Sequence, residues 1–186
     1  NMVTKSTEAQ KGGSAYFGIG NDGFRKYSVS FSTGLMDNGW AITFMGSLNT
    51  GDGYVKGTNY EGWTYFGNIS KVINDHHKLS LTAFGAPQWH NQRSTMHYIE
   101  DYKNSPDGGR FNNGYGYING EAVGSGYGYN YYHKPQVSLN HYWTIDEKST
   151  LTTSLYGSMA TGGGRRARGA MSNWPVSYTH LRAHET

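Results

Sequence analysis

Cysteine is absent from the 186 residues, and proline occurs only four times. Without cysteine, a disulfide framework, a zinc–thiolate site and a thiol nucleophile are all excluded. No run of about 18 apolar residues occurs, so no helix of this chain is expected to span a membrane. Charged residues make up only 16% of the chain and the formal net charge is +3, which does not by itself indicate a nucleic-acid partner.

Glycine and tyrosine are the residues present in excess, with 27 and 16 copies respectively. Glycine disfavours helix interiors and tyrosine favours pleated surfaces, so an ordinary helical protein is an unlikely product of this composition. A disordered chain would contain fewer aromatic residues and more charge. A membrane location stays open, because a transmembrane β-barrel places its lipid-facing residues at every second position and keeps a low average hydropathy.

Alternation of apolar and polar residues with period 2 predicts seven β-strands. The predicted strands cover residues 13–20, 24–34, 39–50, 62–73, 77–86, 136–145 and 149–160. One face of each strand carries large apolar side chains, for example Phe44 and Leu81, and the other face carries mostly Ser, Thr and Asn. Trp40, Trp63 and Trp143 lie near strand ends, as in the aromatic girdles of membrane barrels.

The residue composition of the polar face distinguishes between two architectures. A soluble sandwich usually directs Lys and Glu outward, whereas this face has few charges and suits a wet or plug-filled interior. The predicted fold class is therefore all-β, an antiparallel up-and-down transmembrane β-barrel fragment of about seven strands. A soluble β-sandwich or jelly roll remains the alternative.

Connection lengths also alternate along the chain. The connections after the second, fourth and sixth strands are short and contain Asn or Asp, which favour turns. The first connection is also short, at residues 21–23, whereas those after the third, fifth and seventh strands are longer, and residues 87–135 form the longest. Tight turns at one end and long loops at the other are typical of outer-membrane barrels.

Three segments resemble those of one family. Residues 1–6 (NMVTKS) look like the last strand of a plug domain, residues 84–93 (FGAPQWHNQR) look like the entry into an outer loop, and residues 131–136 (YYHKPQ) look like the re-entry into the next strand. Together they resemble a TonB-dependent outer-membrane receptor of the Bacteroidetes, SusC-like type, over about residues 1–174.

The resemblance implies a division of the chain. Residues 1–12 would be the end of the plug domain and its linker, and residues 13–174 would be the N-terminal part of a barrel of about 22 strands. On this reading the chain is a fragment. Residues 175–186 resemble translated sequencing-adapter DNA and are expected to be a non-native tail, with a genuine helical tail as the alternative.

The resemblance also implies a function. Such a receptor lies in the outer membrane of a Gram-negative cell and imports a glycan, peptide or other small-molecule nutrient, which binds to the extracellular loops and the plug. Expected partners are a TonB complex, reached through a missing N-terminal segment, outer-membrane lipid, and a surface lipoprotein lid. No covalent chemistry, cofactor or nucleic acid is expected. Alternatives are a passive porin or adhesin barrel and a secreted glycan-binding or hydrolytic β-protein.

Four residues are the candidates for substrate contact: Trp89, His90, Gln92 and Arg93. They lie where a predicted strand enters its loop above the barrel interior. Tryptophan offers a stacking surface, and Gln and Arg offer hydrogen bonds. The alternative is that these residues anchor the loop to the plug.

Histidines provide no predicted metal site or catalytic site. His76 and His77 are interpreted as residues of a solvated turn, and His90 and His97 do not match a known metal-ligand spacing. His141 is expected on the apolar face, at a membrane interface or packed against an aromatic ring.

Two further segments have open interpretations. The Gly/Tyr-rich residues 108–132 could form a ligand surface or a loop packed by its own tyrosines. The basic residues 165–168 could contact anionic lipopolysaccharide or form a solvated charge run.

Overall fold

The structure is a computed structural model that describes residues 6–93, 96–115, 117–118, 121–122 and 128–165, and most of these residues form antiparallel β-sheet. The all-β prediction is therefore confirmed. The long strands are β1 (Gly12–Ile19), β2 (Arg25–Leu35), β3 (Trp40–Gly51), β4 (Tyr60–Val72), β5 (His77–Gly85), β10 (Gln136–Thr144) and β11 (Thr150–Ser158). Short strands are β6 (Gln88–His90), β7 (Tyr117–Ile118), β8 (Glu121–Ala122), β9 (Asn130–His133) and β12 (Thr161–Gly164). The helical elements are η1 (Ser6–Glu8), α1 (Ile99–Asn104) and η2 (Gly108–Arg110).

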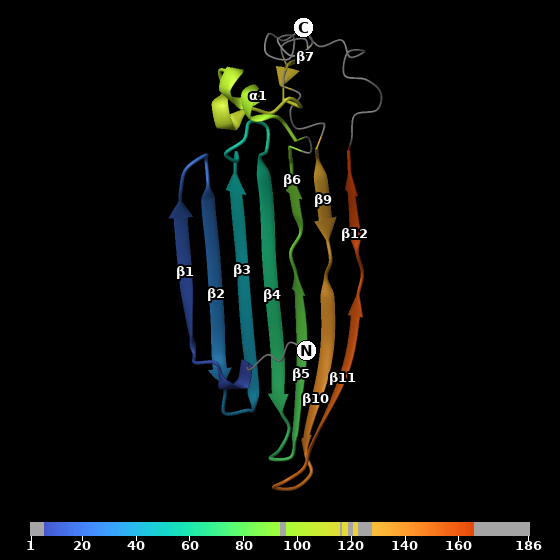
Figure 1. The fold of residues 1–186 in the computed structure, drawn as a ribbon. Coiled ribbons are helices and arrows are strands. Elements are labelled where there is room, and N and C mark those ends of the chain that lie inside the picture. Colours follow the sequence, from blue (N-terminus) through green and yellow to red (C-terminus); the bar gives the residue numbers. More distant parts are fainter. Residues whose placement is uncertain (1–5, 94–95, 116, 119–120, 123–127, 166–186) are drawn as a thin grey trace.

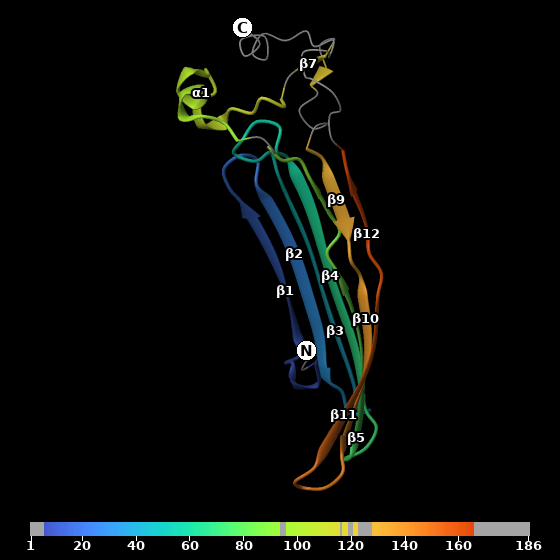
Figure 2. The same ribbon diagram turned by 45° about the vertical axis from the view of Figure 1, so that its right-hand side comes forward.

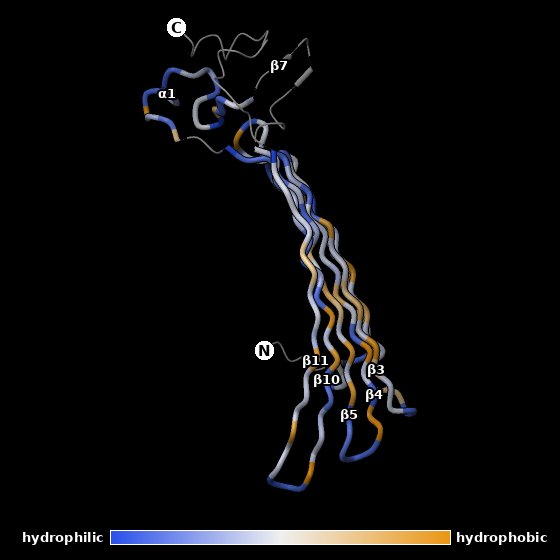
Figure 3. Tube along the Cα trace, turned by 90° about the vertical axis from the view of Figure 1, so that its right-hand side faces the viewer, coloured by the Kyte–Doolittle hydropathy of each residue, from blue (hydrophilic) through white to orange (hydrophobic). Residues whose placement is uncertain are grey.

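The long strands form one sheet in the order β1-β2-β3-β4-β5-β10-β11, each antiparallel to its neighbours (Figure 1). All seven predicted strands are present with ends within two residues of the predicted ones. Within the described residues, β1 and β11 each pair along only one side, so the sheet is open. The edge-on view in Figure 3 shows a single layer of strands.

Three strands continue further than the sequence indicated. β6 pairs with β4 and β9, and β9 pairs with β12, each in the same register as the β4–β5, β5–β10 and β10–β11 pairs below them. β6, β9 and β12 are thus continuations of β5, β10 and β11. The sequence assigned β6 and β9 to a loop because Pro87 and Pro135 interrupt the pattern, and proline cannot donate to a ladder. The Pro87 carbonyl nevertheless accepts a bond from the Trp63 N–H (2.8 Å).

The connections lie at the two ends as predicted. The β2–β3, β4–β5 and β10–β11 turns lie at the lower end, and the β1–β2, β3–β4 and β6–β9 connections lie at the upper end (Figure 1). The last of these contains α1, which projects to one side of the sheet (Figures 2 and 3). Of the predicted plug strand only Ser6 is described, as the start of η1; the predicted non-native tail also lies outside the described residues.

The strand register aligns the apolar side chains of successive strands on one face. The most regular alignment is an aliphatic row across five strands, formed by Ile42, Ile69, Leu81, Leu139 and Leu155. Tyrosine and tryptophan side chains border this row toward the upper end, at Tyr27, Trp63 and Tyr65. Trp40, His141 and Trp143 border it toward the lower end. The predicted assignment of faces is therefore confirmed.

Burial on the two faces is the reverse of that in a soluble protein. Among the described residues, the only buried large apolar side chain is Phe111, which lies in a loop, and Ala41 is the only other buried hydrophobic residue. The aliphatic row is open, with Leu81 45% and Leu155 72% exposed. Asn68 and Ser80 on the polar face are each only 1% exposed.

The polar face is held together by hydrogen bonds between neighbouring strands. The Asn68 side-chain amide donates to Ser80 Oγ (2.8 Å) and Thr82 Oγ1 (2.7 Å). The Ser70 hydroxyl donates to Asn68 Oδ1 (2.7 Å), which completes a β4–β5 network. η1 packs against β2, β3 and β4, the strands that carry the buried Ser32, Ala41 and Ser70. Buried polar groups satisfied in this way add stability rather than cost it.

The excess of glycine and tyrosine has a structural explanation. A tyrosine ring lies over a glycine on the neighbouring strand at two cross-strand pairs, Tyr65 with Gly85 and Tyr60 with Gly51. A Cβ atom at Gly85 would lie 2.6 Å from Tyr65 Cζ, and one at Gly51 would lie 2.8 Å from Tyr60 Cζ. The tyrosine ring covers the backbone of the glycine, which has no side chain of its own. This packing is known from designed and natural sheets.

Candidate functional site

Trp89 lies in β6 and is paired with Glu61 of β4 and Tyr131 of β9. Alternation along the continuous β5–β6 ladder from Leu81 places Trp89 on the apolar face. Its ring stacks on Tyr129, with centroids 6.1 Å apart and planes at 29°. The structure thus places Trp89 at the upper edge of the apolar face, whereas the sequence suggested a position above the polar interior.

His90 is the next residue of β6 and is therefore on the opposite, polar face. Its cross-strand neighbours are Tyr60 and Asn130. Trp89 and His90 are separated by the sheet, so a single small ligand cannot contact both side chains. The structure does not bring these two predicted site residues together.

The Arg93 side chain contacts the loop that follows β6. Its Nη1 donates to the Phe111 carbonyl (2.9 Å), and its guanidinium lies 5.1 Å from the ring centroid of Tyr102. The Gln92 side chain is exposed, and its backbone N–H donates to the Gly128 carbonyl (3.2 Å). These contacts lie within the upper loops, and both roles considered for Arg93, substrate contact and anchoring of the loop to a plug, stay predictions.

The α1 loop, residues 96–115, has a small aromatic core. Phe111 is 2% exposed, and the rings of His97 and Tyr102 lie with their centroids 5.0 and 6.2 Å from it. His97 Nδ1 lies 3.7 Å from Asp101 Oδ2. This packing gives the loop a defined shape despite its low apolar content.

Two ion pairs tie the α1 loop to the other upper connections. Lys56 Nζ in the β3–β4 loop lies 2.6 Å from Asp107 Oδ1, and Arg110 Nη1 lies 2.5 Å from Asp22 Oδ1 in the β1–β2 turn. Asn112 also donates to the Lys56 carbonyl (2.7 Å). The loop is thereby fastened over the upper end of β1–β4.

The sequence placed His77 in a solvated turn, but the structure places it at the start of β5. Its Nδ1 lies 3.0 Å from His141 Nε2, and the two rings stack with planes at 14°. His77 also stacks on Trp143 (5.6 Å). His141 thus packs against the ring of His77, and its position at a membrane interface stays a prediction. His76 remains exposed, with its Nδ1 2.7 Å from the Thr144 carbonyl.

The described residues contain no group of three or more His, Cys, Asp or Glu side chains that could hold a metal ion. Hydrogen bonds lower the pKa of Asp146 in the β10–β11 turn, the first from the Lys148 backbone N–H (2.8 Å) and the next from the Ser149 hydroxyl. This carboxylate lies at the opposite end of the sheet from Trp89, and its hydrogen bonds stabilise the turn to which it belongs.

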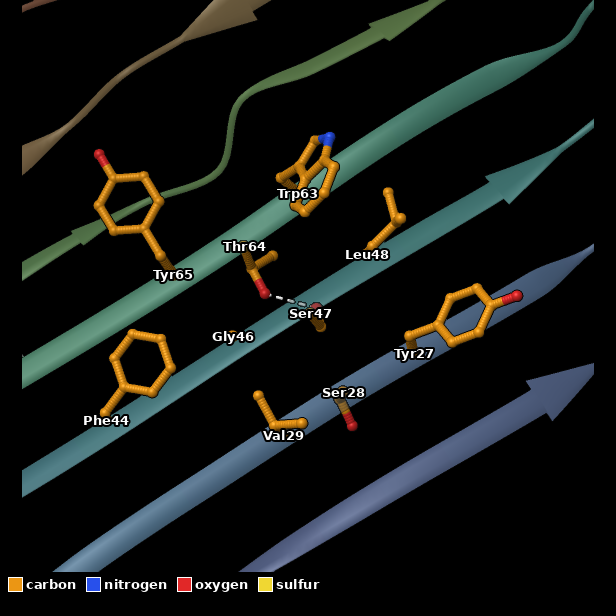
Figure 4. A pocket seen from close by; sticks show the side chains of 10 residues that line it. All are labelled: Tyr27, Ser28, Val29, Phe44, Gly46, Ser47, Leu48, Trp63, Thr64 and Tyr65. Atoms are coloured by element: carbon orange, nitrogen blue, oxygen red, sulfur yellow. Dashed lines mark hydrogen bonds between the residues drawn. The ribbon is translucent and has the colours of Figure 1, made fainter.

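An apolar depression is centred on Gly46 of the apolar face (Figure 4). Because Gly46 has no side chain, the surrounding larger side chains form its rim, which consists of Tyr27, Val29, Phe44, Leu48, Trp63 and Tyr65. The Ser47–Thr64 hydrogen bond (2.5 Å) belongs to the polar face behind it. The depression is continuous with the rest of the apolar face.

Sequence reasoning missed the Asn68 network and the role of Tyr129. Both were in principle accessible: Asn68 falls on the predicted polar face, and Tyr129 has the same parity as Tyr131 and Val137. The missing information was the register, which decides which strands carry the partners.

Comparisons with known proteins identified nothing: no protein-family model, curated protein or solved structure matches this chain. No helix within the described part of the chain is long and apolar enough to cross a membrane.

Proposed function

We propose that this sheet forms part of the wall of an outer-membrane β-barrel and that the protein is a TonB-dependent transporter for nutrient uptake. The observation that carries the proposal is the reversed burial of the two faces. A contiguous apolar surface across seven strands would be costly in water but is stable against lipid acyl chains.

The height of the apolar face agrees with a bilayer. On β4 it extends from Trp63 to Lys71, which at about 3.4 Å per residue gives about 27 Å along the strand. With the tilt of about 40° that barrels adopt, the height becomes about 21 Å, close to the band of about 25 Å found in outer-membrane barrels. Tryptophan and lysine at the lower border, Trp40 with Lys71 Nζ 5.1 Å from its ring centroid, suit the boundary between acyl chains and water.

Support for active transport comes from the sequence resemblance rather than from the fold. On this proposal the polar face lines a plug-filled interior, and substrate binds to the upper loops and the plug. A TonB complex supplies energy from the inner membrane, and a surface lipoprotein can cover the loops. The protein itself carries out no covalent chemistry.

The orientation can be tested with single cysteines introduced into this chain, which has none of its own, after any cysteine elsewhere in the full-length protein has been replaced by serine. Asn104→Cys lies in α1 at the upper end, and Glu147→Cys lies in the β10–β11 turn at the lower end. In intact cells that express the full-length protein, a membrane-impermeant maleimide is expected to label Asn104→Cys at once and Glu147→Cys only after the outer membrane is permeabilised. Equal labelling of both positions in intact cells would contradict the proposal.

Transport requires a separate test. Deletion of the gene and deletion of the TonB complex are expected to abolish growth on the same nutrient in a screen of glycans, peptides, siderophores and vitamins as limiting sources. A passive porin would instead continue to supply the nutrient when the TonB complex is absent.

A further inference from the structure

Four side chains form a continuous stack at the upper edge of the apolar face. Trp89 stacks on Tyr129, and Tyr129 is tilted against Tyr131, with ring centroids 5.8 Å apart. The guanidinium carbon of Arg165 lies 5.4 Å from the ring centroid of Tyr129. The Arg165 backbone N–H donates to the Tyr129 carbonyl (2.8 Å), which fixes the end of β12 against β9.

Arg165 differs from the other arginines of the upper connections in how its donors are used. Arg110 pairs with Asp22, and Arg93 donates to the Phe111 carbonyl. No carboxylate of residues 6–93, 96–115 or 128–165 forms an ion pair with Arg165, and its contact is with an aromatic ring. The guanidinium therefore keeps its N–H groups for a partner outside the described sheet.

Glu61, an acidic residue of the apolar face beside Trp89, is already engaged. Glu61 is in the same row as Trp89 and Tyr131, and its Oε1 accepts a bond from Trp63 Nε1 (2.8 Å). β6 and β9 lie between β4 and β12, so three strand spacings, about 14 Å, separate Glu61 from the end of β12. Glu61 is therefore too distant to form an ion pair with Arg165.

We infer that Arg165, supported by the Trp89–Tyr129–Tyr131 stack, binds the phosphate of an anionic membrane lipid. This inference rests on the proposed membrane location. Aromatic rings that border an apolar face lie at headgroup depth, and a guanidinium that is stacked on a ring presents its N–H groups at its edge, where a phosphate oxygen pair can accept two hydrogen bonds. Continuity with the apolar face fixes the source of the phosphate as a lipid whose acyl chains lie against the aliphatic row.

The test uses the full-length protein in phosphatidylcholine vesicles with a fluorophore on a single cysteine at Thr161→Cys in β12. A nitroxide-bearing phosphatidylglycerol or a nitroxide-bearing phosphatidylcholine is added at equal mole fraction, and fluorescence quenching is measured. Quenching by the anionic lipid is expected at a lower mole fraction. In Arg165→Gln that preference should fall about fivefold, the change that corresponds to about 1 kcal/mol per basic residue at an anionic surface.

Two further variants serve as controls. Arg165→Lys keeps the charge but loses the planar group that donates two hydrogen bonds, so it should retain only part of the preference, and Arg110→Gln, whose native arginine is ion-paired to Asp22, should retain all of it. Equal quenching by the two lipids, or an unchanged preference in Arg165→Gln, would overturn the headgroup site and leave the membrane location intact. Absence of quenching by either lipid would overturn the membrane location, and the site with it.

Discussion

An arginine placed in the aliphatic row should distinguish a lipid-facing sheet from one in water. Leu155 and Thr152 lie on the same strand, β11, both are exposed, and they face opposite sides of the sheet. Leu155 belongs to the aliphatic row midway between the aromatic borders, so in a membrane its side chain lies near the bilayer centre. Arginine at that depth costs about 2–4 kcal/mol. In water, a side chain that is already 72% exposed would lose little when replaced by arginine.

The assay is equilibrium urea unfolding of the full-length protein folded into phospholipid vesicles. Leu155→Arg should lower the free energy of unfolding by about 2–4 kcal/mol, and Thr152→Arg, on the polar face, should change it by less than about 1 kcal/mol. The difference of at least about 1 kcal/mol corresponds to at least about a fivefold change in the unfolding constant. If both variants unfold within about 0.5 kcal/mol of the native protein, the face that carries Leu155 is not in contact with lipid.

Three further substitutions test the packing of the sheet and its upper loop. Gly85→Ala should lower the free energy of unfolding by about 1–3 kcal/mol, because its Cβ would clash with the ring of Tyr65. Gly67→Ala, whose Cβ would meet nothing within 4 Å, should be neutral or slightly stabilising in the same unfolding assay. Equal effects of the two substitutions would refute the packing of the tyrosine ring over the glycine. Asn68→Ala should cost about 2 kcal/mol, since it removes the buried hydrogen bonds that the amide forms with Ser70, Ser80 and Thr82, and a neutral result would show that water replaces the amide. Arg93→Gln should speed proteolysis within the α1 loop without altering the unfolding transition; an unchanged cleavage rate would show that the loop does not depend on this anchor.

Much of the sheet could be predicted because period-2 alternation is a local signal. Strand positions, the two faces and the lower turns depend only on neighbouring residues, and all of them are found in the structure. β6, β9 and β12 were missed for a local reason as well, since prolines and glycines in the upper segments hide the continuing alternation.

The site was harder to predict because its geometry depends on register and on loop contacts. Trp89 and His90 are adjacent in sequence and were grouped as one site, but their strand separates them onto two faces. The role of Arg93 depends on Phe111, 18 residues away in a loop whose fold has no sequence periodicity. Substrate contact by Trp89, His90, Gln92 and Arg93 stays a prediction, and alanine substitutions in the full-length protein would test it.

The most direct test of the central claim is a spin-label scan along β11. Single cysteines at each position from Leu151 to Ser158 carry a nitroxide in the full-length protein in vesicles, and collision rates with oxygen and with a water-soluble nickel complex are measured. The account predicts alternation with period 2, in which residues 151, 153, 155 and 157 favour oxygen and the even-numbered residues favour the nickel complex. Nickel accessibility at Leu155 equal to that at Ser154 would contradict it.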